Sequence, residues 1–220
     1  MERGALIVFE GLDQSGKKYL SQYADFVFNQ GDWVAVDRLS FPRLYWGLDG
    51  YNLRKYLYGM VDLSPEEAYK LFSKQRHEVT DWIKALLADN TYVVIDRFYH
   101  SGIAYGMANG LDRKWCVEQE LGLPKPDAVI YLDITPEESV KRSQYRARRY
   151  DTIEFQTGVK KAYEELVDNT WHRIDATGDW KTTESQMLDI THEIVREFKR
   201  KPRPLEVLTV DHFNELKRDV

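Results

Sequence analysis

The stretch VFEGLDQSGKKYL, residues 8–20, decides the fold of this chain. A β-rich apolar run at 4–10 leads into it, and helical periodicity follows from residue 17. Between them, Gly11, Gly16 and Lys17 match the G-x-x-x-x-G-K pattern of a P-loop. Glycine allows backbone N–H groups to wrap a phosphate closely, and the lysine reaches the β- and γ-phosphates. The pattern favours a nucleotide-binding loop over an ordinary strand–turn–helix.

The residue after Lys17 departs from the P-loop pattern. A Ser or Thr is expected there because its hydroxyl is a ligand of Mg²⁺, and this chain has Lys18 instead. An ammonium group cannot bind a cation and is repelled by one. Two outcomes stay open. Lys18 faces solvent or a phosphate oxygen while water and Asp96 hold Mg²⁺ in a slow enzyme, or the metal site is lost and the chain only binds nucleotide.

The composition limits the class of protein. A chain of 220 residues, 43% of them hydrophobic, is long enough for one α/β domain with a core. A formal net charge of -5 argues against a general binder of nucleic acid or of membrane surfaces. Cys116 is the single cysteine, so no internal disulfide forms and a reducing compartment suits the chain. No signal-peptide pattern and no membrane-spanning apolar run is found, so we expect a cytoplasmic protein, with the nucleus as a second location, and not a secreted one.

Strand and helix patterns alternate along the chain and indicate the fold class. Continuously apolar runs predict strands that are covered on both faces. We expect strands at 4–10, 33–38, 91–97, 127–133 and 171–176, and helices at 17–30, 65–89 and 154–169. This order predicts the three-layer α/β fold of P-loop NTPases, with a five-stranded parallel sheet between helices and one domain over residues 1–200. The tail at 201–220, interrupted by Pro202 and Pro204, forms either a strand and helix on the domain or a loose end.

A second charged motif follows the predicted strand at 91–97. In VVIDRFYHSGIAYG, residues 93–106, Asp96 and Arg97 lie just beyond the buried run. Ligands of open α/β sheets bind at the carboxyl edge of the strands. An Asp at this edge can hold Mg²⁺ or orient a nucleophile, and an Arg can clamp a phosphate. For an isolated Asp-Arg pair a surface salt bridge is the alternative, but its place behind a P-loop favours a phosphate site.

With these motifs the chain resembles the thymidylate kinase family, P-loop nucleoside-monophosphate kinases that make dTDP from dTMP and ATP. The likeness extends from Arg3 to about Thr191 and is closer to the eukaryotic or large-DNA-virus branch than to the bacterial one. The segments that carry it are RGALIVFEGLDQSGK (3–17), FP (41–42), LFSKQRHE (71–78), VVIDRFYHSGIAY (93–105), GLPKPDAVIYLD (122–133) and RRYDTIEFQ (148–156). GLPKPD and Asp-Arg-aromatic-x-x-Ser-Gly are specific to this family among P-loop kinases.

The resemblance implies a role for each matching residue. The substrates would be ATP with Mg²⁺ and a nucleoside monophosphate, dTMP, and the protein would be a homodimer. ATP would be bound by Gly11, Gln14, Ser15, Gly16, Lys17, Lys18 and Arg142. The acceptor would be bound by Asp13, Phe41, Pro42, Arg43, Phe72, Arg76, Arg97, Ser101, Gly102, Tyr105, Tyr150 and Gln156. Catalysis would depend on Asp13, Lys17, Asp96, Arg97, Arg146 and Arg148, and Asp96 would help to hold Mg²⁺.

Phe72 and Arg76 would read the base of the acceptor. The resemblance implies that Phe72 stacks on the thymine ring and that Arg76 donates a hydrogen bond to its carbonyl edge. Four residues separate the two on a predicted helix. This spacing alone also fits a core phenylalanine beside a surface arginine.

A cluster of cations, KRSQYRARRY at 141–150, is the candidate lid. A segment that closes over ATP would bring arginines to the transferred phosphate. In one class of the family that arginine follows the loop aspartate, where this chain has Gln14. The hypothesis therefore assigns the role to Arg146 or Arg148, and the alternative is a solvated basic helix face.

Three departures from the family pattern fall at the ligand sites. Lys18 and Tyr19 replace hydroxyl residues, Arg43 comes one position early in FPRLYWGLDG (41–50), and SKQRHE (73–78) replaces Asn and Trp around Arg76. Besides a dTMP kinase, a non-catalytic nucleotide-binding relative and a kinase with altered monophosphate specificity therefore stay open. A P-loop GTPase is disfavoured because the guanine-reading Asn-Lys-x-Asp is missing.

Overall fold

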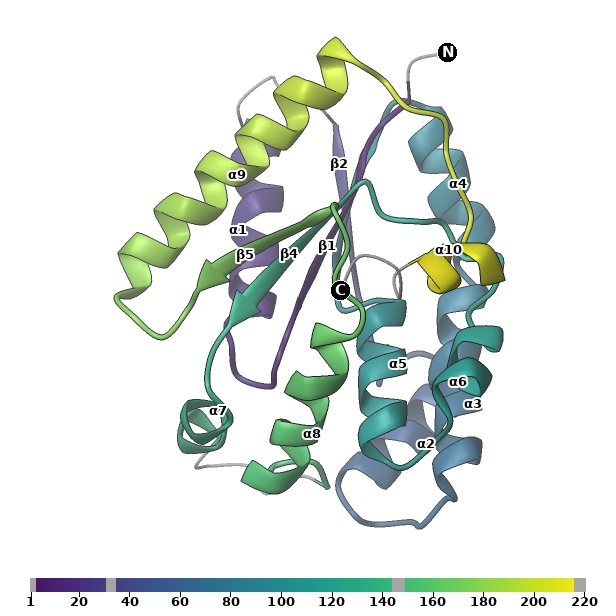
Figure 1. Ribbon diagram of the computed structural model, residues 1–220. Coiled ribbons are helices and arrows are strands. Elements are labelled where there is room, and N and C mark those ends of the chain that lie inside the picture. Colours follow the sequence, from purple (N-terminus) through teal and green to yellow (C-terminus); the bar gives the residue numbers. More distant parts are fainter. Residues whose placement is uncertain (1–2, 31–34, 144–148, 216–220) are drawn as a thin grey trace.

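A parallel sheet of five strands forms the centre of the computed structural model, which describes residues 3–30, 35–143 and 149–215 (Figure 1). The strands are β1 (Leu6–Gly11), β2 (Val36–Ser40), β3 (Tyr92–Asp96), β4 (Ala128–Asp133) and β5 (Trp171–Asp175). They lie in the order β2-β3-β1-β4-β5. In the middle, Val8 of β1 pairs with Ile95 of β3 on one side and with Val129 of β4 on the other. The predicted five-stranded parallel sheet is confirmed.

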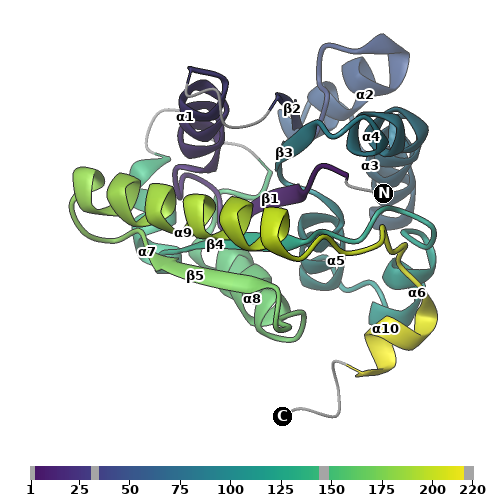
Figure 2. The ribbon, with the colours of Figure 1, turned by 90° about the horizontal axis from the view of Figure 1, so that it is seen from above.

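Helices cover both faces of this sheet and complete the three layers. They are α1 (Lys17–Gln30), α2 (Gly47–Leu57), α3 (Pro65–His77), α4 (Thr80–Ala88), α5 (Tyr99–Ala108), α6 (Arg113–Glu118), α7 (Pro136–Arg142), α8 (Ile153–Glu164), α9 (Trp180–Arg200) and α10 (Val210–Glu215). Figures 1 and 2 show α1 and α9 together on one face, and α5 and α8 together on the other. Over the described part of the chain, no helix combines the length and the apolar character needed to cross a membrane.

Three predicted elements differ from the structure. The helix expected at 154–169 is α8 (Ile153–Glu164), which ends five residues earlier. The expected helix at 65–89 is two helices, α3 and α4, with Glu78 and Val79 between them. The chain turns there because α3 packs against α5 whereas α4 packs against β3. The strand expected at 33–38 lies further along the chain, at Val36–Ser40. Its bounds follow from its pairing with β3, in which Val36 is opposite Tyr92 and Ser40 is opposite Asp96.

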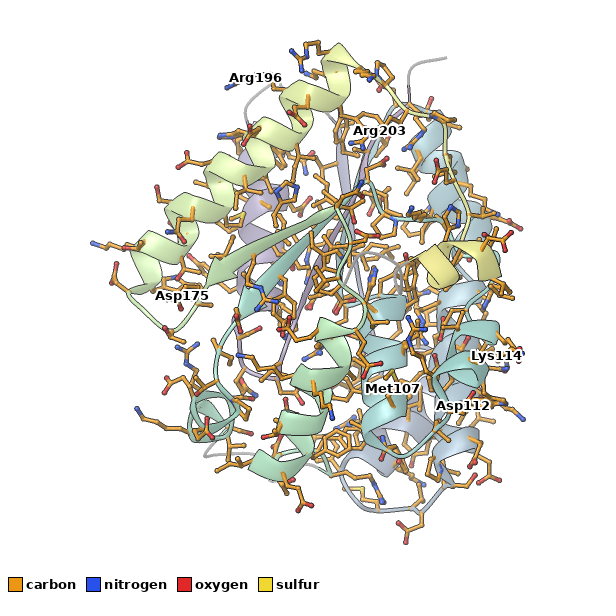
Figure 3. The ribbon with its side chains drawn as sticks, in the orientation of Figure 1. Met107, Asp112, Lys114, Asp175, Arg196 and Arg203 are labelled. Carbon is orange, nitrogen blue, oxygen red and sulfur yellow. The ribbon has the colours of Figure 1, made fainter. Side chains whose placement is uncertain are left out.

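The described part of the tail, residues 201–215, packs back on the domain and is not a loose end. Figure 3 labels Arg203 on the segment that leaves α9. The Arg203 carbonyl accepts a hydrogen bond of 2.8 Å from Arg3 Nε. Further on, Leu208 N donates to Leu123 O at 2.8 Å, and the Leu208 side chain is buried. The short helix α10 follows and contacts α6.

Candidate active site

A cavity of about 850 Å³ opens at the carboxyl edge of the sheet. Its walls come from the loop after β1, the ends of β2 and β3, and helices α2, α3 and α5. The predicted site residues that line it are Asp13, Gln14, Gly16, Lys17, Lys18, Phe41, Pro42, Arg43, Phe72, Arg76, Asp96, Arg97, Ser101, Gly102, Tyr105 and Tyr150. Gly11, Ser15, Arg142 and Gln156 lie outside this lining, and Arg146 and Arg148 lie outside the described residues. Segments far apart in sequence therefore meet in one cavity.

The loop after β1 has the backbone of a phosphate cradle. Gly11 and Gly16 have φ angles of 138° and 100°, and Gln14 has a φ of 58°. A Cβ at Gly11 would lie 2.5 Å from the carbonyl oxygen of Leu132. A Cβ at Gly16 would lie 2.8 Å from the ring of Trp180, at the start of α9. Both the dihedral angles and the space thus require glycine at these two positions.

Lys17 is folded onto its own loop. Its Nζ donates hydrogen bonds to the carbonyl oxygen of Leu12 and, at 3.0 Å, to Ser15 Oγ. The side chain is 4% exposed, and burial, with the nearby positive charge of Arg97, lowers the pKa of Lys17 to about 7. The cause is electrostatic, because a buried ammonium without a full counter-charge favours its neutral form. A phosphate group in the loop would supply the missing negative charge.

The two departures at the start of α1 behave differently. Tyr19 OH donates to Glu184 Oε2 at 3.1 Å, and the Tyr19 ring meets the Trp180 ring edge-on at 4.8 Å. Tyr19 thus connects α1 to α9. Lys18 is exposed and lines the cavity, and its side chain makes no hydrogen bond or ion pair with any described residue, although its carbonyl oxygen accepts one of 3.1 Å from Ser21 Oγ.

Arg97 and Asp13 form the junction between the loop and the strand β3. Arg97 has a φ of 65°, and its Nη2 donates to Asp13 Oδ1. Gln156 of α8 holds the same aspartate, with Nε2 donating to Asp13 Oδ2 at 3.2 Å and Oε1 accepting from Asp13 N at 3.2 Å. Tyr105 OH lies 3.4 Å from Arg97 Nη1. The predicted residues Asp13, Arg97, Tyr105 and Gln156 are therefore one connected group.

Asp96 offers little to a divalent cation. Its Oδ2 lies 3.3 Å from Ser40 Oγ and 3.6 Å from Arg38 Nη2, so the carboxylate already has a positive neighbour. No group of three or more His, Cys, Asp or Glu side chains that could hold a metal ion occurs within 3–30, 35–143 and 149–215. The hydroxyl ligand of a P-loop is replaced by Lys18. A Mg²⁺ ion prefers several oxygen ligands, and the protein groups at this end of the cavity do not fit it.

Arg76 is buried and paired, unlike the surface arginine that the spacing left open. Its Nε donates to Glu120 Oε2 at 2.9 Å, and its Nη2 donates to Glu120 Oε1. Gly102 of α5 makes room for this pair, because a Cβ there would lie 2.5 Å from Arg76 Nη2. Phe72, one turn earlier on α3, is half-buried and lines the cavity. Glu120 was missed by the sequence analysis, since it is 44 positions from Arg76 and carries no local signal.

The segment after β2 is held by a second residue that the sequence analysis missed. Gln75 Oε1 accepts a hydrogen bond of 2.9 Å from Arg43 N, and Gln75 Nε2 donates to Arg43 O at 3.2 Å. The Arg43 guanidinium lies over the Trp46 ring at 4.1 Å. Phe41 and Pro42 precede this clamp, joined by a cis peptide bond. The altered loop at 43–46 is therefore an ordered part of the cavity wall.

Glu10 is a third missed residue, and it fixes the start of α5. It is fully buried, and its carboxylate accepts hydrogen bonds from Phe98 N at 2.8 Å, Ser101 N at 3.2 Å, Ser101 Oγ at 2.5 Å and Tyr163 OH at 2.9 Å. These bonds lie directly beside Arg97. The sequence signal that could have found Glu10 is an acidic residue at the end of the apolar run 4–10.

The described ends of the lid segment are attached to the domain. Arg142 Nε donates to Glu138 Oε1 at 2.8 Å, and its Nη2 donates to Ala176 O at 3.0 Å, which places it beyond β5. Tyr150 stacks on Phe155 at 4.5 Å and shares a hydrogen bond of 3.0 Å with Tyr56. Arg142 thus lies on the side of the loop away from the acceptor residues, and Tyr150 closes the cavity wall.

The glycine loop and its lysine, placed between a parallel sheet and α1 and facing Asp96 and Arg97, define a P-loop kinase. A family model described as thymidylate kinase matches residues 9–187. The chain belongs to the thymidylate kinase family, whose members are ATP-dependent nucleoside-monophosphate kinases.

Individual relatives are similar over most of their length. A thymidylate kinase of Dictyostelium discoideum is 37% identical over 80% of this chain and 79% of that protein. One from Arabidopsis thaliana is 35% identical over 94% of this chain and 77% of that protein. A solved structure of thymidylate kinase from Candida albicans, 26% identical, has a TM-score of 0.79 and covers 94% of this chain and 99% of that chain.

Proposed function

We propose that this protein transfers the γ-phosphoryl group of ATP to dTMP and gives dTDP and ADP. One observation carries the proposal: the phosphate cradle with Lys17, the partly buried Arg97 and the buried Arg76 face the same cavity of about 850 Å³. A cavity of this size lies in the range of small-molecule sites in proteins. Membership of the thymidylate kinase family supports the choice of acceptor. Nothing in the comparisons favours a non-catalytic relative or altered specificity.

Phosphoryl transfer needs alignment and neutralisation of charge more than it needs chemical groups on the protein. The loop from Gly11 to Gly16 and the Lys17 ammonium would bind the β- and γ-phosphates. Arg97 would clamp the acceptor phosphate, and Asp13, fixed by Gln156, would keep the guanidinium oriented. Charge on the transferred group is then met from both sides.

The acceptor base would lie between Phe72 and Arg76. Glu120 occupies Nε and Nη2 of Arg76, and Nη1 makes no hydrogen bond with any residue that the structure describes. That group is free to donate to a carbonyl oxygen of thymine. The half-buried ring of Phe72 offers the stacking face, which would fix the plane of the base.

A coupled assay with ATP, Mg²⁺ and a panel of nucleoside monophosphates tests the function. We expect turnover of dTMP well above that of dUMP, dCMP, dAMP and dGMP, and loss of turnover in Lys17→Met. Lys161→Met, an exposed lysine outside the cavity, is the matched control and should keep its activity. Measurable ATP binding without turnover of any monophosphate would contradict the proposal.

A cytoplasmic homodimer completes the proposal. Any Mg²⁺ would enter with ATP, held by the nucleotide's own phosphates and water, because Asp96, its one predicted protein contact, is already paired with Arg38. The family resemblance supports the dimer, and light scattering of the purified chain tests it. Cys116 is buried, and burial raises the pKa of its thiol to about 12, which suits a cysteine without a redox role.

A further inference from the structure

The lining of the cavity as a whole has more cationic than acidic side chains. Five cationic side chains and two carboxylates line the whole cavity: Lys17, Lys18, Arg43, Arg76 and Arg97, with Asp13 and Asp96. Both carboxylates already have a positive partner. Asp13 is paired with Arg97, and Asp96 lies 3.6 Å from Arg38 Nη2. A divalent cation would thus meet no unpaired carboxylate here, and after Lys17 it would meet an ammonium group in place of the expected hydroxyl.

Lys18 stands where a P-loop presents its metal-binding hydroxyl, and its neighbours fix that position. Lys17 is held by Leu12 O and Ser15 Oγ, and Tyr19 is held by Glu184 and Trp180. Lys18 lies between these two anchored residues, and its side chain has no hydrogen bond or ion pair to a described residue. Lys18 is an exposed residue that lines the cavity, one position beyond the lysine of the cradle.

We propose that the Lys18 ammonium binds the nucleotide's phosphates in place of the metal, so that this chain binds ATP without Mg²⁺. The inference rests on the proposed function only in taking ATP as the ligand. An ammonium group carries a positive charge and three N–H donors, so it can neutralise and bind phosphate oxygens as a metal ion does. Free ATP is more negative than its Mg²⁺ complex, and it therefore matches a cavity whose carboxylates are already neutralised.

Isothermal titration of the full chain with ATP, in excess Mg²⁺ and in excess EDTA at equal ionic strength, tests this inference. We expect the two dissociation constants of the natural protein to differ by less than about threefold. In Lys18→Thr the hydroxyl returns, and ATP should bind about tenfold more tightly with Mg²⁺ than with EDTA. Lys18→Arg keeps the charge and should behave as the natural protein does.

Lys18→Met separates charge from the loss of a side chain. We expect it to lose about tenfold in affinity for ATP in EDTA, whereas Lys161→Met stays unchanged. Thermal unfolding of the same preparations shows that each variant is folded, and binding of dTMP shows whether the acceptor side is intact. A chain that binds ATP as expected but not dTMP would contradict the proposed function and leave this inference supported.

Two results would overturn the inference. One is a natural protein that binds ATP at least about threefold more tightly with Mg²⁺ than with EDTA. The other is an affinity of Lys18→Met in EDTA equal to that of the natural protein, because Lys18 would then be an ordinary solvated lysine.

Discussion

Arg76 and Glu120 form a buried ion pair behind the acceptor side of the cavity. The two side chains are 4% and 0% exposed, and Arg76 Nε lies 2.9 Å from Glu120 Oε2. The carboxylate fixes the plane of the guanidinium, because two of its nitrogens are engaged at once. The group predicted to read the base is therefore oriented before any nucleotide binds.

Replacing Glu120 by Ala should destabilise the protein and weaken acceptor binding together. Removal of one partner of a buried pair leaves an uncompensated charge and costs about 3–5 kcal/mol in the free energy of unfolding. We also expect the KM for dTMP to rise more than the KM for ATP. Urea unfolding and steady-state kinetics measure the two effects. Glu118→Ala, whose side chain is 45% exposed near Lys114, is the control and should change neither. Equal KM changes for both substrates would refute the assigned role.

Gly102 should tolerate no side chain, although it lies inside a helix. An added Cβ would lie 2.5 Å from Arg76 Nη2 and 3.2 Å from Glu120 Oε1, so Gly102→Ala must displace the ion pair. Overpacking of this kind costs about 1–3 kcal/mol. Gly158→Ala in α8 is the matched control, because its Cβ meets only Ala108 at 3.5 Å. That change should stabilise the helix by up to about 1 kcal/mol. Thermal unfolding of the two variants should therefore shift in opposite directions.

Glu10 should act as a positioning residue for Arg97. Glu10→Gln keeps the shape, but its amide NH₂ takes the place of the oxygen that accepts from Ser101 Oγ and Tyr163 OH, so these two hydroxyls lose their acceptor. Unfolding experiments should show a loss of about 1–3 kcal/mol, since a buried acceptor is removed. Kinetics should show a higher KM for dTMP and a lower kcat, because the start of α5 follows Arg97 directly. The exposed Glu193→Gln serves as the comparison. An unchanged KM for dTMP would leave Glu10 as a purely structural residue.

The stability of the nucleotide-free protein should depend on pH through Lys17. Burial lowers the pKa of Lys17 to about 7 in the folded protein, whereas a lysine in the unfolded chain has a pKa of about 10.4. Between these pH values the unfolded state binds one more proton, so stability rises with pH. The free energy of unfolding of the natural protein minus that of Lys17→Met should increase from pH 7 to pH 10 by on the order of 4 kcal/mol. It should stay constant below pH 7, and a difference that is flat throughout would contradict the assignment.

The lid arginines should matter for turnover rather than for stability. Removing a group that stabilises charge in the transition state costs about 10²-fold in kcat or more. We expect this loss in Arg146→Ala or in Arg148→Ala, and little change in Lys141→Ala, which is exposed in the same segment. The single-turnover rate with ATP and dTMP measures it. If neither arginine variant loses more than a few-fold, the donor arginine lies elsewhere.

Local patterns were sufficient for the fold class and for the donor loop. The G-x-x-x-x-G-K spacing and the buried β runs depend on residues within a few positions of one another. The N-cap of α3 does so too, because Ser64 Oγ accepts a hydrogen bond of 3.2 Å from Glu67 N. The same holds for Asp96 and Arg97, whose place at the end of a strand follows from the strand alone. These features can be read from the sequence because backbone geometry sets them.

Only the tertiary structure decided which distant residues support the site. Glu120 is the partner of Arg76, Gln75 clamps Arg43, and Glu10 anchors the start of α5. The tertiary structure also decided that the expected helix at 65–89 is two helices and that the tail packs against Leu123. Each depends on a contact between segments that packing brings together, and many acids or amides along the chain could have made it. Periodicity fixes which face of an element is buried, but it carries no information on what lies opposite that face.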